Sequence, residues 1–311
     1  MASTPSTSSS APSAPSQTAP LKPVASSPGA FSAASFHRSS EVQYLKLLVY
    51  GPHGAGKTTL LCSACDVADM RDVLLVTIEG GMIVLEDNDR IRAPEWLDII
   101  KIERIEQLQK VADMLKAHVA WRDDPSKEDK LLELQATIGL DDSRVRRFRT
   151  VIIDSLSEVE AMNLAKILNL DAIGLDAGDD MEVAGFPQFR KNMHLMQRIV
   201  RRFRDMPMHV LITCAQSFTQ DERKAYHYAP KLTGQLTGII QGFFDVVGWL
   251  VPNAAQVDQT TGIAKRFLFV QPQTAPKADA KCRLASHKAA YFEDPTMLTI
   301  MQQTGMLKKK G

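Results

Sequence analysis

The sequence has few cysteines and no long apolar segment, and each absence excludes a class of protein. Its 311 residues include four cysteines, too few for a disulfide-stabilised scaffold, so a reducing compartment such as the cytoplasm is expected. No apolar run approaches the ~18 residues of a membrane-spanning helix, and the N-terminus has no apolar signal core. Lysine plus arginine total 37 and aspartate plus glutamate 36, so bulk charge favours no particular partner.

Composition divides the chain into a polar N-terminal tail and a core rich in apolar residues. Residues 1–39 are mostly serine, alanine, proline and threonine, and no acidic residue precedes Glu41. Such a segment has too little apolar surface to offset the entropy of ordering it, so we expect a disordered tail. Residues 40–285 form the expected core, within which 122–149 is a charged, exposed insertion, and residues 286–311 form a C-terminal segment.

One glycine-rich stretch gives the strongest functional signal. Residues 51–58 match G-x-x-x-x-G-K-[ST], the phosphate-binding loop, between an apolar strand and a helix. Glycines let the backbone turn tightly, so that its N–H groups face phosphate oxygens. Lys57 is expected to contact the β- and γ-phosphates of ATP, and the Thr58 hydroxyl to bind Mg²⁺. The expected nucleotide-binding residues are Gly51, Pro52, His53, Gly54, Ala55, Gly56, Lys57, Thr58 and Thr59.

Apolar segments alternate with helical patterns along the core. The expected strands are residues 44–50, 73–78, 97–102, 150–153, 208–214, 243–251 and 265–270. The expected helices begin near Thr59 and also cover about 105–119, 156–169 and 189–206. Strands separated by crossover helices predict an α/β fold with a mostly parallel sheet and helices on both faces. Two polar, glycine-containing stretches, 171–187 and 217–242, are expected to be loops.

Three polar residues that follow expected strands are candidates for catalysis. Asp154 has the position of a Walker B aspartate, which holds Mg²⁺ through water, and the alternative is a helix cap. Glu79 could orient the water that attacks the γ-phosphate, or could be an ordinary turn acid. Gln216 could donate to a γ-phosphate oxygen and transmit the nucleotide state to the loop that follows, or could be an ordinary polar residue.

Basic residues gather in three places that could contact a nucleic-acid backbone. For two of them, the expected helix 189–206 with its arginines and the segment 144–149, we favour a solvated surface. The stretch after Gln216 mixes basic and aromatic side chains, and aromatic rings can stack on bases. Its candidate DNA-contacting residues are Arg223, Lys224, Tyr226, His227, Tyr228 and Lys231.

Taken in order, these motifs resemble the ATPase core of RecA-type recombinases. They are more similar still to small bacteriophage RecA-like ATPases that act in single-strand annealing and recombination, and the resemblance covers residues 41–285. It implies ATP hydrolysis with Mg²⁺, with Glu79 as the catalytic glutamate and Gln216 as the reporter of nucleotide state. The features that carry it are the phosphate loop, Glu79, Asp154-Ser155, Gln216, the segment 230–250, and Lys281 and Arg283 of a Lys-x-Arg motif.

The resemblance also implies partners. Lys281 and Arg283 fall where such proteins send basic residues into a neighbour's ATP site, which implies a ring or filament with ATP at subunit interfaces. The stretches 171–187 and 217–242 fall where RecA-type proteins have two DNA-facing loops. Single-stranded DNA is therefore the expected partner, and a single-strand-binding protein is a further candidate.

Two departures from the recombinase pattern leave other functions open. The core has no evident folded DNA-binding domain beside it, and the stretch 171–187 is acidic, which disfavours phosphate contact. Annealing is therefore a safer expectation than strand exchange. One alternative is a P-loop ATPase for protein assembly or remodelling without a DNA role, favoured by the net charge of +1. Another is a nucleotide-binding regulator that barely hydrolyses, which requires Glu79 to be structural.

Overall fold

The computed structural model describes residues 44–79, 90–170, 184–222, 224–257, 264–284 and 289–307. These residues belong to one compact unit, Gln43–Gly311. The expected tail over 1–39, most of the expected loop 171–187, and Arg223 lie outside the described residues. Among the residues that are described, no helix is long and apolar enough to cross a membrane.

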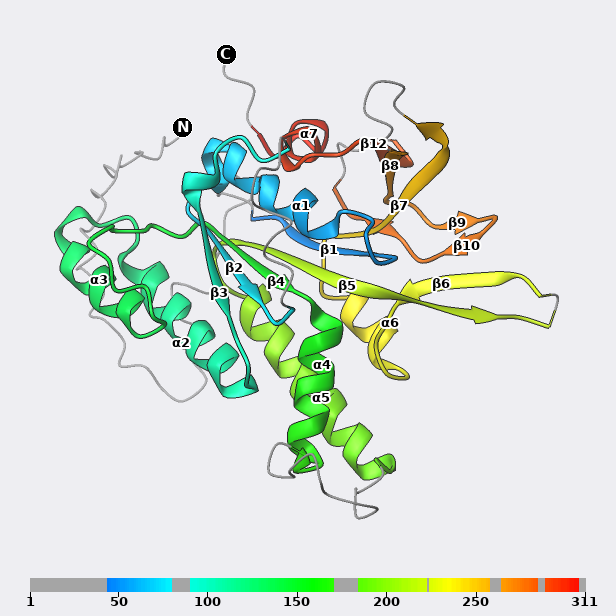
Figure 1. Cartoon of the computed structure of the whole chain (residues 1–311), viewed down its shortest axis with the longest axis horizontal. Helices are drawn as coiled ribbons and strands as arrows, with labels where there is room; N and C mark the ends of the chain where they lie inside the picture. Colours follow the sequence, from blue (N-terminus) through cyan, green and yellow to red (C-terminus); the bar gives the residue numbers. More distant parts are fainter. Residues whose placement is uncertain are drawn as a thin grey trace, which may run out of the picture. The chain divides into compact units, whose positions relative to one another are not determined.

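One large sheet organises this unit (Figure 1). Its principal strands are β1 (Lys46–Gly51), β2 (Val73–Thr77), β3 (Leu97–Lys101), β4 (Thr150–Asp154), β5 (His209–Gln220), β7 (Val246–Val257), β8 (Ala264–Phe269) and β12 (Tyr291–Glu293). Their order is β12-β8-β7-β1-β5-β4-β2-β3. All pairs from β7 to β3 are parallel, whereas β7 with β8 and β8 with β12 are antiparallel. The expected mostly parallel sheet is confirmed, with an antiparallel edge.

Helices cover both faces of the sheet because its central strands are apolar on both sides. The helices are α1 (Lys57–Cys62), α2 (Ile105–Trp121), α3 (Glu128–Ala136), α4 (Leu156–Ile167), α5 (Phe186–Arg204), α6 (Leu236–Gln241) and α7 (Met297–Gln303). Leu48 and Tyr50 of β1 pack in one core cluster with side chains of α2, α4, α5 and α6. Leu47 and Val49 pack in a second cluster with α1 and α7. The expected cover on both faces is therefore confirmed.

The stretch 217–242 is not a loop, and that expectation is wrong for most of its length. β5 runs on to Gln220 and turns back as β6 (Tyr226–Pro230), and α6 follows. Phe218 contacts Tyr226 and Tyr228 across the hairpin, with ring centroids 5.6 and 6.4 Å apart. Cross-strand aromatic pairs stabilise such a ribbon, although the polar residues between them conceal the strand pattern in the sequence.

Three short strands tie the chain after β8 back to the sheet. They are β9 (Gln273–Thr274), β10 (Lys277–Ala278) and β11 (Lys281–Cys282). β10 pairs in parallel with β6, and β11 pairs antiparallel with the first residues of β7. The hairpin of β5 and β6 is therefore extended by β10, which pairs with β6, and by β9, which pairs with β10.

The expectation that the segment 122–149 is exposed is wrong in part, because the segment contains α3 and contributes buried side chains to the core. Phe148 is fully buried, and Arg146 is only 4% exposed. The Arg146 guanidinium lies 2.7 Å from the carboxylate of Asp98 and 2.6 Å from that of Asp142. The neighbouring arginines are also paired, Arg144 with Asp72, Arg147 with Glu128 and Arg149 with Asp123. These pairs support the structural interpretation of this basic cluster over a nucleic-acid contact.

Arg146→Ala is expected to lower the free energy of unfolding by about 3–5 kcal/mol, because it leaves the buried Asp98 carboxylate unpaired. Arg149→Ala is the matched control, since Arg149 is an exposed arginine whose pair contributes at most about 1 kcal/mol. Urea denaturation of both variants measures the difference. Equal midpoints for the two variants would show that the Arg146 pairs do not stabilise the fold.

Candidate nucleotide-binding site

The phosphate loop connects the end of β1 to the start of α1, as the sequence predicts. Gly54 and Gly56 have φ angles of 73° and 84°, in the left-handed region that glycine adopts without strain. Gly51 lies against β7, where a Cβ atom would be 2.1 Å from the Leu250 carbonyl oxygen. The backbone of the loop thus has the conformation that needs glycine at these positions. His53 and Gly54 are exposed at its tip.

Lys57 lies across the mouth of this loop. Its Nζ donates to the carbonyl oxygens of Gly51 at 3.1 Å and Pro52 at 2.9 Å. Burial lowers the pKa of Lys57, while the nearby carboxylates of Asp154 and Glu79 act in the opposite direction. The two carbonyl oxygens hold the ammonium group at the loop. A bound phosphate would offer stronger, charge-assisted hydrogen bonds to the same group.

The Asp154 carboxylate is held by two threonine hydroxyls. Thr58 Oγ1 donates to its Oδ2 at 2.6 Å, and Thr213 Oγ1 on β5 donates to its Oδ1. The residue is only 7% exposed, at the carboxyl end of β4 next to the phosphate loop. Thr213 is not evident from the sequence motifs, although a threonine inside the apolar run of β5 is the signal that could have indicated it. The structure brings Thr58 and Asp154 together as expected for a magnesium site.

Glu79 follows β2 and lies beside the end of β4. Its Oε1 accepts a hydrogen bond from Ser155 Oγ at 3.0 Å, and its carbonyl oxygen accepts one from Thr77 Oγ1 at 2.9 Å. The strand register explains this neighbourhood, because Thr77 is directly opposite Asp154. The carboxylate is otherwise exposed. The Ser155 hydroxyl thus positions the Glu79 carboxylate. The carboxylate remains accessible to water, and it lies on the same side of the phosphate loop as Asp154.

Gln216 lies on β5, one residue beyond the position that pairs with Gly51. Its Oε1 accepts a hydrogen bond from Trp249 Nε1 on β7 at 2.7 Å. The amide NH₂ group makes no hydrogen bond to any described residue, so it remains available as a donor. This geometry fits a residue that contacts a phosphate oxygen. Trp249 is a further positioning residue that the motifs do not reveal.

Lys281 and Arg283 lie at the far end of β7 from the phosphate loop. Lys281 pairs with Val247 and its Nζ donates to the Gln241 carbonyl oxygen at the end of α6. Arg283 Nη2 donates to the Gly242 carbonyl oxygen at 3.2 Å. Within the described residues, neither side chain bonds to the phosphate loop of its own chain. Their role in a neighbour's site therefore stays a prediction.

The candidate DNA-contacting residues divide into an exposed group and an internal group. Lys224, Tyr226 and Lys231 are exposed on the β5–β6 hairpin. Phe218, which the sequence analysis did not select, is the most exposed aromatic residue there, at 62%. The other two side chains face inward, because His227 pairs with Asp279 at 2.7 Å and Tyr228 stacks on Trp249 at 5.2 Å.

Stacked rings connect this hairpin to Gln216. Tyr226 stacks on Tyr228 with centroids 6.2 Å apart, and Tyr228 stacks on Trp249, which bonds to Gln216. The exposed tip of the hairpin is therefore joined to the candidate sensor by packed side chains. A change at Gln216 could reach the hairpin through this row.

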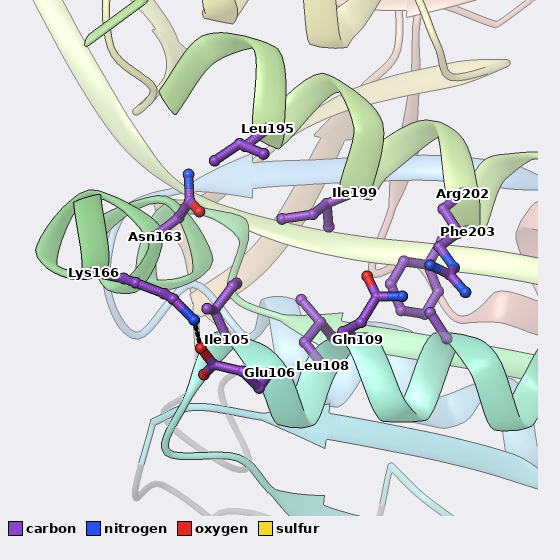
Figure 2. A pocket seen from close by; sticks show the side chains of 11 residues that line it. Ile105, Glu106, Leu108, Gln109, Asn163, Lys166, Leu195, Ile199, Arg202 and Phe203 are labelled. Atoms are coloured by element: carbon purple, nitrogen blue, oxygen red, sulfur yellow. Dashed lines mark ion pairs between the residues drawn. The ribbon is translucent and has the colours of Figure 1, made fainter. Parts of the chain in front are cut away.

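Three of the arginines of α5 are engaged with neighbouring side chains. Arg202 pairs with Asp113 and Arg204 with Asp205, while Arg201 lies over the Phe243 ring at 4.9 Å. A pocket of about 260 Å³ opens between α2, α4 and α5, with mostly apolar side chains on its walls (Figure 2). An ion pair between Glu106 and Lys166 closes one end of it (Figure 2). It includes no residue of the phosphate loop or of the strand ends around it.

Comparison with known proteins gives a family match over most of the chain. Residues 43–284 match the family model AAA_24, described as an AAA domain. A RadB recombinase structure has a TM-score of 0.34 and 13% identity, covering 75% of this chain and 85% of RadB. The flagellar accessory protein FlaH from Methanocaldococcus jannaschii has a TM-score of 0.37 and 12% identity, covering 82% and 87%. No curated protein matches the sequence. At these scores, the two structures give no information about function.

Proposed function

The chain belongs to the AAA_24 family, and on that premise we propose that it is a RecA-like P-loop ATPase that binds and hydrolyses ATP. One observation carries the proposal: the Thr58 hydroxyl and the Asp154 carboxylate meet at 2.6 Å beside the Lys57 ammonium group. These are the three groups that a P-loop enzyme needs to hold a nucleotide with its metal ion. The phosphate loop and the strand end at Asp154, which are far apart in the sequence, thus meet at one site.

The donor set fits Mg²⁺. Mg²⁺ is typically bound by one or two protein oxygens together with phosphates and water, and Thr58 and Asp154 supply such oxygens. No cluster of three or more His, Cys, Asp or Glu ligands occurs in the part of the chain that the structure describes. When bound, the ion neutralises charge on the transferred phosphoryl group.

Other residues of the site bind the phosphates and take part in hydrolysis. The loop amides and Lys57 hold the phosphates and stabilise the negative charge that develops on them. Glu79 lies next to Asp154 and orients the attacking water, while Ser155 Oγ fixes the position of its carboxylate. Gln216 donates a hydrogen bond from its amide to the γ-phosphate, and loses that bond when the γ-phosphate leaves.

We propose further that the ATPase acts on single-stranded DNA, in phage-type recombination or annealing, through the exposed part of the β5–β6 hairpin. Phe218 and Tyr226 offer exposed rings and Lys224 offers a cation, which together suit stacking and backbone contact. The working form is a homo-oligomer in which Lys281 and Arg283 act in the neighbour's ATP site. A single-strand-binding protein is a candidate partner for this activity.

The second candidate function is an ATPase for protein assembly or remodelling without a DNA role. The observation that favours it is the balanced charge, with 37 basic and 36 acidic residues, together with the internal pairing of several arginines. In that case the exposed rings of the hairpin would contact a protein. A protein partner that stimulates turnover when DNA does not would support this function.

Replacing both Phe218 and Tyr226 with alanine is expected to weaken single-stranded DNA binding about thirtyfold or more. Base stacking contributes about 1–3 kcal/mol per base, and both rings are exposed. Fluorescence anisotropy with labelled oligothymidine at low and moderate salt measures the change. Tyr291→Ala is the matched control, because Tyr291 is also 45% exposed but lies on β12. Equal affinity of the double variant and the control would contradict a DNA role for the hairpin.

A further inference from the structure

Arg266 on β8 is a buried arginine that lies against the phosphate loop. The residue is 9% exposed, and its Nε makes no hydrogen bond to any residue that the structure describes. The Oδ1 atom of Asp294 lies 3.8 Å from this Nε, too far for a hydrogen bond. The same oxygen already accepts the Arg266 backbone N–H at 3.3 Å. The guanidinium is therefore largely desolvated, and the counter-charge of Asp294 is distant from its Nε.

The guanidinium lies directly against the phosphate loop. A Cβ atom built on Gly56 would be 2.1 Å from Nη1 and 3.2 Å from Cζ of Arg266. Gly56 immediately precedes Lys57 and has a φ angle of 84°. The strand register gives the reason, because Arg266 pairs with Pro252, two residues beyond the Leu250 that contacts Gly51. The Arg266 side chain thus lies beyond the carboxyl end of β1, beside the phosphate loop.

Burying the Arg266 guanidinium beside the phosphate loop costs free energy unless an anion binds to it. Desolvating a guanidinium without full hydrogen bonding opposes folding, and Lys57 is a second cation of the same loop. A polyphosphate would offer both cations oxygen acceptors. Arginine forms charge-assisted, bidentate contacts with phosphate oxygens. Two cations at one loop, Lys57 and Arg266, are therefore suited to binding a highly charged anion.

We propose that Arg266 is a further nucleotide-binding residue, a second cation that contacts the phosphates of the nucleotide held by the loop of its own chain. This inference rests on the proposed function, because it concerns the same site. It differs from the expectation for Lys281 and Arg283, which act on a neighbour. It also assigns Gly56 a second role, since any side chain there would displace the guanidinium.

Arg266→Gln is expected to weaken binding of both ADP and ATP about tenfold or more, because one charge-assisted contact is lost. Isothermal titration calorimetry on the full chain measures this, with Lys265→Gln, an adjacent and half-exposed lysine of β8, as the control. Pyrophosphate is titrated in parallel, and its affinity should fall by the same factor as that of ADP. The unfolding midpoint without nucleotide should stay unchanged or rise in Arg266→Gln, because a buried cation is removed.

Other outcomes separate this proposal from the proposed function. If Lys57→Ala loses nucleotide binding but Arg266→Gln binds like the unaltered chain, Arg266 has no ligand role and the ATPase proposal stands. A lower unfolding midpoint with unchanged affinity would make Arg266 purely structural. Weaker ADP binding with unchanged pyrophosphate binding would place Arg266 on the base or ribose and overturn the phosphate contact. If the unaltered chain binds neither ADP nor ATP, both proposals fail.

Discussion

Lys57→Ala will abolish measurable ATP turnover and weaken nucleotide binding. The Lys57 ammonium group is the cation held by the loop itself, through the carbonyl oxygens of Gly51 and Pro52. Removing it takes away a charge that faces the developing negative charge of the transferred phosphoryl group. Loss of one such preorganised donor typically reduces the rate by about a hundred- to thousandfold.

Phosphate release and isothermal titration calorimetry measure the two effects of this substitution. Lys166→Ala is the matched control, since Lys166 is a surface lysine paired with Glu106 and lies in the pocket between α2 and α4, away from the loop. Turnover by the Lys57 variant equal to that of the Lys166 variant would mean that hydrolysis does not occur at this loop.

Glu79→Gln will retain nucleotide binding and lose hydrolysis. The glutamine keeps an oxygen that can accept the Ser155 hydroxyl, so the side chain should hold its position while the carboxylate charge is lost. General-base catalysis of this kind contributes about a hundred- to ten-thousandfold to the rate. Single-turnover hydrolysis together with calorimetry separates chemistry from binding in this variant.

Turnover of a Ser155 variant and of the unaltered chain also tests the role of Glu79. Ser155→Ala removes the hydroxyl that positions the carboxylate, so it should lower turnover less than Glu79→Gln does. If turnover is low in the unaltered chain and Glu79→Gln leaves it unchanged, Glu79 is structural. The chain would then be a nucleotide-binding regulator, and the ATPase proposal would fall.

The parts of the fold that follow from local patterns could be predicted from the sequence. Central strands such as β2 and β4 are fully buried and read as apolar runs, and the phosphate loop is specified by its glycines. The hairpin after Gln216 could not be predicted, because its stability comes from cross-strand contacts such as Phe218 with Tyr226, which alternate with polar residues.

Some residues of the candidate site could likewise be predicted from the sequence, and others could not. Asp154 could be located because it ends a strand, and the meeting of Thr58 with it follows from the motif. Thr213 and Trp249 could not be located, because their contacts depend on which strands are neighbours in the sheet. The burial of Arg146 between two carboxylates likewise depends on tertiary packing, and in the sequence it is one of several closely spaced arginines.

ATP turnover with and without single-stranded DNA, at low and moderate salt, tests the central claim most directly. We expect Mg²⁺-dependent turnover that DNA stimulates, with a stimulation that fades as salt rises, because contacts with the DNA backbone are screened. The Phe218 and Tyr226 double variant should keep its basal turnover and lose the stimulation. Turnover that is indifferent to DNA at both salt concentrations would contradict the DNA role and favour the remodelling ATPase.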